Sequence, residues 1–67
     1  MSIARVTEIS ATSEKGFEDA VRQGIQRANE TLRNVKSAWI KEQSVDCDNG
    51  APTRFRVNMM VTFVLDD

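Results

Sequence analysis

Sixty-seven residues suffice for one domain, but a single hydrophobic core of this size only just offsets the loss of chain entropy. Nine basic and ten acidic residues are interspersed and give a net charge of −1, so no basic field attracts nucleic acid. Cys47 is the only cysteine and histidine is absent, which excludes an internal disulfide and a Cys/His zinc site.

The N-terminus lacks the basic segment and apolar run of a signal peptide, and no stretch approaches the roughly 20 apolar residues of a membrane span. We therefore expect a soluble, cytoplasmic protein with no membrane partner, folded as one domain over residues 1–67. Since disulfides and metal are not available, association with identical copies is the remaining source of stability.

The first strand and the helix are identified by a change in the spacing of their apolar residues. β-branched residues from Ile3 to Ile9 predict a strand, and the polar cluster 10–13 predicts a loop after it. A helix is predicted from Phe17 to Arg33, because apolar residues there recur at steps of three and four. Gly16 is an acceptable N-cap, and Asn34 can end the helix in a left-handed conformation.

Within this helix, Glu18 and Arg22 form a favourable i,i+4 pair on the wet side. Gly24 lies inside the apolar stripe, where it costs about 1 kcal/mol in helix propensity. A close approach of the helix to the sheet would explain why a glycine stands at this position despite that cost.

Alternation from Val35 to Val45 predicts a second strand. It places Ser37, Trp39, Lys41 and Gln43 on one face and Lys36, Ala38, Ile40, Glu42 and Ser44 on the other. Asn49-Gly50 predicts a tight turn, and Pro52 is expected to delay pairing of the returning strand, which runs from about Thr53 to Leu65.

The last strand is two-faced, and its apolar side must meet the helix: Phe55, Val57, Met59, Val61, Phe63 and Leu65. The fold class is therefore α+β, a β-α-β-β unit with a three-stranded antiparallel sheet packed on one helix. A helix of about 26 Å cannot cover a strand of about 43 Å. Trp39, Met60 and Val64 on the opposite face would also be left wet, so we expect neighbouring copies to cover them.

The sequence shows no catalytic motif, because no nucleophile is paired with a general base and the glycines are not spaced as in a phosphate-binding loop. We expect no enzyme and no catalytic residues. The acidic turn 46–50 suggests calcium, but EF-hand spacing would require glycine where Ala51 stands, so a solvated hairpin turn is the simpler reading. Cys47 is interpreted as an incidental thiol.

Trp39 can be interpreted in two ways, as a subunit-contact residue or as a stacking surface for a flat ligand. Arg56 on the same face can supply donors to an anion or a carbonyl-rich ring, or it can form an ion pair with Glu42 or Glu8.

The segments Gly16–Val21 and Ile25–Val35 and the ending Val61–Leu65 resemble the dodecin family, and the resemblance covers nearly the whole chain. Dodecins are hollow twelve-subunit particles that bind flavins at subunit contacts. The resemblance therefore implies a homododecamer that stores riboflavin, FMN or FAD.

In the family, a tryptophan on the second strand stacks on the flavin and a glutamine on the third strand binds the ring edge. The matching positions in this chain are Ser37 and Arg56. Trp39 can restore a stacking surface or fill the space of the flavin, and Arg56 offers donors but no acceptor. Glu42 matches a position where related sequences carry an acidic residue near the ligand's polar chain, and Gln43 follows it.

These residues leave two functions open. Either the particle holds a flavin-like ligand with Ser37, Trp39, Glu42, Gln43 and Arg56, or it is a cage without flavin, in which Trp39 anchors the subunit contact and Arg56 pairs with a carboxylate or another anion.

Overall fold

The computed structural model describes residues 3–65, which form one helix and three strands in the order β-α-β-β. Their bounds are β1 (Ala4–Ser13), α1 (Phe17–Leu32), β2 (Val35–Asp48) and β3 (Ala51–Val64). The predicted α+β fold class is confirmed. Among the described residues, no helix has both the length and the apolar character needed to cross a membrane.

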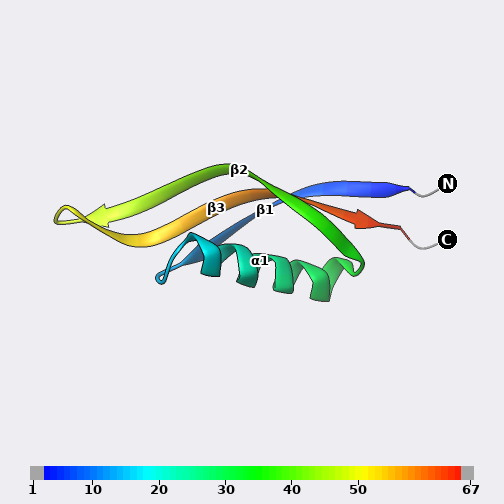
Figure 1. The fold of residues 1–67 in the computed structure, drawn as a ribbon, viewed down its shortest axis with the longest axis horizontal. Helices are drawn as coiled ribbons and strands as arrows, with labels where there is room; N and C mark the ends of the chain where they lie inside the picture. The colour runs from blue at the N-terminus through cyan, green and yellow to red at the C-terminus, as the bar shows by residue number, and fades with distance from the viewer. Residues whose placement is uncertain (1–2, 66–67) are drawn as a thin grey trace.

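The sheet has the order β1-β3-β2, and β3 pairs antiparallel with both neighbours. The chain enters on β1, crosses through α1 to the far edge, and the β2–β3 hairpin then fills the centre. The helix lies along one face of this sheet, while the opposite face carries no helix or strand of residues 3–65 (Figure 1). We call that opposite surface the open face.

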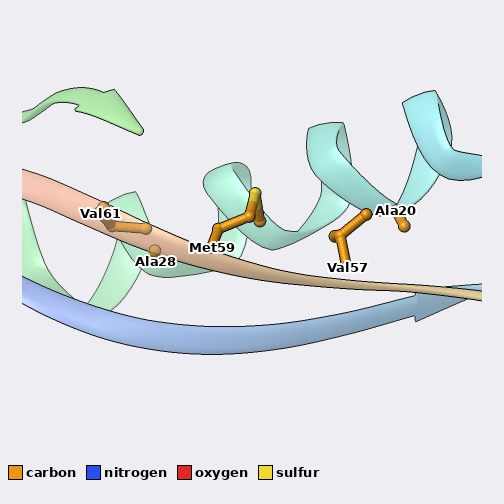
Figure 2. Packing of buried hydrophobic residues seen from close by; sticks show 5 residues of the cluster. All are labelled: Ala20, Ala28, Val57, Met59 and Val61. Carbon is orange, nitrogen blue, oxygen red and sulfur yellow. The ribbon is translucent and has the colours of Figure 1, made fainter. Parts of the chain in front are cut away.

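The core lies between α1 and the helix-side residues of β3. Figure 2 shows Ala20 and Ala28 of the helix against three side chains of β3, namely Val57, Met59 and Val61. These three are fully buried, as the two-faced pattern of the last strand predicts. Such a core is small, because the helix contributes mainly alanine and glycine to its buried side.

The helix begins at Phe17 as predicted and ends at Leu32, one residue before the expected Arg33. Asn34 has a φ of 53°, so the left-handed end predicted there is confirmed, and Arg33 before it also has a positive φ, 62°. The expected Glu18–Arg22 ion pair forms at 2.8 Å.

The first strand is longer than predicted. The polar cluster 10–13 was expected to be a loop, but it continues β1, and each of its residues pairs with one on β3 from Asn58 to Phe55. The prediction was wrong because an available partner strand satisfies the backbone of these polar residues, whatever their turn propensity. Ser13 is buried and donates to Asp19 on the helix.

The hairpin is also longer than predicted. Asn49 and Gly50 form the expected tight turn, with φ of 52° and 80°, values typical of a type I′ turn. The strands reach Asp48 and Ala51 on either side of it, so Pro52 does not delay pairing, since it lies opposite Cys47. A register shift between Asp46 and Cys47 accommodates the proline. Leu65 lies just beyond β3, and it is exposed.

The predicted mismatch between helix and sheet is present. The molecule extends 52 Å along its longest axis, whereas sixteen helical residues span about 24 Å. The hairpin tip projects past the first turn of α1, and the sheet ends near both termini project past its last turn (Figure 1). Large apolar side chains remain exposed in these parts, among them Ile3, Val45 and Leu65.

Candidate functional site

Trp39 lies on the open face, on the edge strand β2. It lies directly opposite Met60 on β3, and 51% of its surface is exposed. Val6 of β1 is exposed on the same face, opposite Thr62, which in turn pairs with Ser37. The four residues Val6, Ser37, Trp39 and Met60 therefore form a largely apolar patch across the three strands, with the indole on the β2 side, as the alternation predicts for Trp39 and Met60.

A β-bulge at Lys41 changes the faces that follow it. Ile40 pairs with Met59, and the next paired residue is Glu42, opposite Asn58, so Lys41 is the extra residue. Because one inserted residue reverses the alternation, Glu42 lies on the open face and Gln43, opposite the buried Val57, lies on the helix side. The faces predicted for Glu42 and Gln43 were therefore wrong.

Ser44 needs the same correction, and Lys36 has no partner on β3. A second irregularity skips Lys36 between Val35 and Ser37, while Ser44 lies opposite Arg56 on the open face. The simple alternation from Val35 to Val45 thus holds only from Ser37 to Ile40. The sequence does not reveal the two irregularities, because a bulge adds a residue without changing the residue type.

Arg56 lies on the open face as predicted, but its partner is Asp46. Its two terminal nitrogens donate to the two carboxylate oxygens of Asp46 at 3.3 and 3.1 Å. The expected partners are engaged elsewhere: Glu42 accepts from Asn58 at 3.1 Å, and Glu8 pairs with Lys41 at 3.4 Å. Strand alternation alone could not identify Asp46 as the partner of Arg56, because that prediction requires the register of the hairpin.

Four of the five predicted site residues thus share one surface: Ser37, Trp39, Glu42 and Arg56. Gln43 does not join them. Along β3, the partner of Ser37 is six residues from Arg56, or about 20 Å, so these two positions of one copy lie far apart. A flat ligand that meets both would have to receive them from different copies of the chain.

A groove of about 490 Å³ runs between β1 and α1. Its lining is mostly apolar and includes Ile9, Ala11, Ala28 and Leu32, together with the polar Gln23 and Arg27. It borders the free edge of β1, which no strand pairs within the described chain. The sequence analysis did not predict this groove, since it depends on the angle at which the helix crosses the sheet.

The hairpin tip carries the acidic residues of the turn 46–50 and the free, exposed Cys47. Over residues 3–65, no group of three or more acidic, Cys or His side chains comes together that could hold a metal ion. Asp46, one of these acids, is the residue paired with Arg56.

Comparison with known proteins agrees with the fold. The dodecin family model matches residues 3–66. Calcium dodecin from Mycobacterium tuberculosis is 29% identical over 63 residues, which cover 94% of this chain and 89% of the relative.

Two solved structures are similar. The dodecin from Streptomyces davaonensis superposes with a TM-score of 0.93 at 36% identity, covering 98% of this chain and 97% of that one. The crystal structure of the M. tuberculosis calcium dodecin, described as having a novel calcium-binding site, gives 0.83 at 26% identity, covering 97% and 93%.

Proposed function

The chain belongs to the dodecin family, and from that premise we propose that it forms a homododecamer that binds and stores a flavin-type planar ligand at its subunit contacts. The proposed role is sequestration and not catalysis. The ligand would be riboflavin, FMN or FAD, held against Trp39.

The observation that carries the proposal is the exposure of Trp39. A large indole, half exposed beside Met60 on a face that no helix or strand of residues 3–65 covers, is the kind of surface on which a flat aromatic ring stacks. Ser37 and Thr62 add small polar groups next to it. The surface is open in one copy, so a second copy is needed to enclose a ligand.

Assembly is supported by what one copy leaves exposed. Both edge strands are unpaired on their outer side within the described chain, and the lining of the groove beside β1 is mostly apolar. Ile3, Val6, Trp39, Ile40, Val45 and Leu65 are each at least 40% exposed. Surface of this extent is typical of a protein whose folded form includes its neighbours.

The experiment is to record the visible absorption spectrum and the mass of the purified protein, then to titrate it with riboflavin and FMN while following flavin fluorescence. Stacking on Trp39 should quench the emission. A monomeric mass, or emission unchanged at tens of micromolar protein, would contradict the proposal. The titration is run with added calcium and with chelator, because a relative is named for calcium.

A second candidate is the same cage without flavin, with Trp39 as an anchor of the subunit contact. It is favoured by the ion pair to Asp46, which already engages two N–H donors of Arg56. A Trp39→Ala variant separates the two. Intact assembly with lost flavin binding supports the stacking role, and loss of assembly supports the anchor.

A further inference from the structure

Lys41 forms an ion pair that crosses the central strand of the sheet. Its Nζ atom lies 3.4 Å from the Oε1 atom of Glu8. Lys41 belongs to β2 and Glu8 to β1, and β3 lies between these two strands. Neighbouring strands are about 4.8 Å apart, so the pair spans roughly 10 Å of sheet. Because Glu8 lies opposite Met60 on the open face, the two charged groups meet above β3 on that face.

The β-bulge in β2 explains why Lys41 is available for this contact. With the extra residue, β2 has both Lys41 and Glu42 where a regular strand would place one residue beside Asn58. Glu42 accepts a hydrogen bond from Asn58 at 3.1 Å, and Lys41 reaches over β3 to Glu8. Bulges are frequent beside functional sites, where they redirect a side chain. This bulge lies two residues after Trp39.

The ion pair borders the apolar patch. Glu8, Met60 and Trp39 form one row across the three strands, because Met60 is the strand partner of both other residues. The Lys41 side chain runs to the β1 end of this row from the position just after its β2 end. It therefore passes beside Met60, where a ring stacked on Trp39 and extending over β3 would lie.

This contact is weakly held. The side chains of Lys41 and Glu8 keep 52% and 44% exposure, and one nitrogen meets one oxygen. Arg56 and Asp46, by contrast, are joined at two points. Exposed ion pairs contribute little to stability, because water and salt screen the charges. A ligand that covers Met60 can therefore open the Lys41–Glu8 pair at a small cost in affinity.

We propose that the Lys41–Glu8 pair is a releasable strap over β3, closed in the free protein and opened when a planar ligand covers Trp39 and Met60. This inference rests on the proposed function and deepens it, because it makes ligand binding depend on ionic strength. Salt weakens the closed strap by screening its two charges. A neutral ligand should therefore bind more tightly as salt rises, and Lys41 and Glu8 act as positioning residues for it.

The test titrates the protein with riboflavin, which carries no phosphate, and follows the quenching of its fluorescence at several salt concentrations. Raising NaCl from about 20 mM to about 500 mM should tighten binding about two- to fivefold, the effect of losing one exposed ion pair. Glu8→Gln and Lys41→Gln should each bind at low salt as tightly as the parent does at high salt. Neither variant should respond further to salt.

Two more variants separate the strap from a general effect of salt on apolar binding. Glu18→Gln removes the exposed Glu18–Arg22 pair on the helix, away from the open face, and should keep the salt response of the parent. The exchanged double variant, Glu8→Lys with Lys41→Glu, rebuilds the strap in reverse and should restore the response. Assembly mass and far-UV circular dichroism at each salt concentration ensure that the same folded particle is compared.

An affinity for riboflavin that does not change with salt in the parent would overturn the inference while leaving the proposed function in place. The same salt response in Glu8→Gln, Lys41→Gln and the parent would overturn it as well, since the response would then not come from the strap. If riboflavin does not bind the parent or either strap variant at tens of micromolar protein, the proposed function itself fails, and the inference fails with it.

Discussion

Gly24 of the helix lies directly against Met59 of the central strand. A Cβ built on Gly24 would come within 2.7 Å of the Met59 terminal methyl carbon and 2.9 Å of the Ala11 Cβ. The close approach predicted from the sequence is therefore confirmed, and it determines how closely α1 packs on the sheet.

We expect Gly24→Ala to destabilise the protein. Met59 can turn its methyl group away, but the Ala11 Cβ is fixed to the backbone of β1, so helix and sheet must separate. Overpacking of this kind costs about 1–3 kcal/mol, which offsets the roughly 1 kcal/mol gained in helix propensity. Denaturant unfolding at fixed protein concentration measures the difference.

The matched control is Gly16→Ala, because a Cβ at Gly16 meets nothing within 4 Å and its φ of 163° is extended backbone. Because Gly16 is the N-cap, where alanine is less favourable than glycine, that variant should lose no more than about 1 kcal/mol, and none of it from overpacking. A more stable Gly24→Ala protein would show that the helix can move away from the sheet at little cost.

Arg33 is the residue with the least favourable backbone. Its φ of 62° and ψ of 158° fall in a region that is essentially restricted to glycine and costs on the order of 1–3 kcal/mol. Its N–H donates to Asn29 and holds it there. Arg33→Gly should therefore raise the free energy of unfolding by about 1 kcal/mol, after the entropy of the added glycine is subtracted.

Arg33→Ala separates backbone strain from charge, since it removes the guanidinium and keeps the Cβ. We expect no gain in stability from that variant. Equal stabilisation by alanine and glycine would mean that the guanidinium, and not the backbone, carries the cost.

A hydrogen-bond cluster ties the end of β1 to the first turn of α1. The Ser13 hydroxyl donates to Asp19 at 2.6 Å and accepts from the Lys15 N–H at 2.9 Å, and Gln23 also donates to Asp19. The hydrogen bond from Ser13 is the main cause that lowers the pKa of Asp19 below its usual 3.8, with smaller contributions from Lys15, Gln23 and Arg22, while partial burial opposes them.

Because the folded pKa of Asp19 is depressed, its contribution to stability is complete above the unfolded value near 3.8 and is lost as the pH falls through the folded pKa. Asp19→Asn should therefore make unfolding less dependent on pH below about 4. Ser13→Ala should have the same effect in part. An unaltered acid-unfolding curve for both variants would contradict the assignment.

The sequence predicted the arrangement of elements better than their ends. Strong periodicity located α1 from Phe17, and the two faces of β3 identified Val57, Met59 and Val61 as core. The end of β1 was missed because the residues 10–13 are polar, as in a loop, while the strand partner of Ser13, Phe55, lies far away in the chain and its acceptor, Asp19, lies on the next element.

The candidate site was predictable only in part, for a geometric reason. Trp39 follows from alternation, but the bulge at Lys41 moves Glu42 onto the open face and Gln43 off it. The Asp46–Arg56 contact joins residues ten positions apart across a hairpin, and it depends on how two irregular strands align. Bulges add one residue without changing its type, so alternation does not reveal them.

Trp39 also provides a spectroscopic test of assembly. It is the chain's only tryptophan and the chain has no tyrosine, so its emission reports on the open face alone. In a separate copy the indole is 51% exposed and should emit as a hydrated side chain, whereas covering by a neighbour removes that water. Emission should therefore shift to shorter wavelength as protein concentration rises, in step with the mass measured by light scattering, because association follows mass action.

Trp39→Phe is the control for assembly without the reporter, since it keeps an aromatic ring on the patch. A growing mass without any shift would place the subunit contacts elsewhere, at the groove beside β1 or at the hairpin tip.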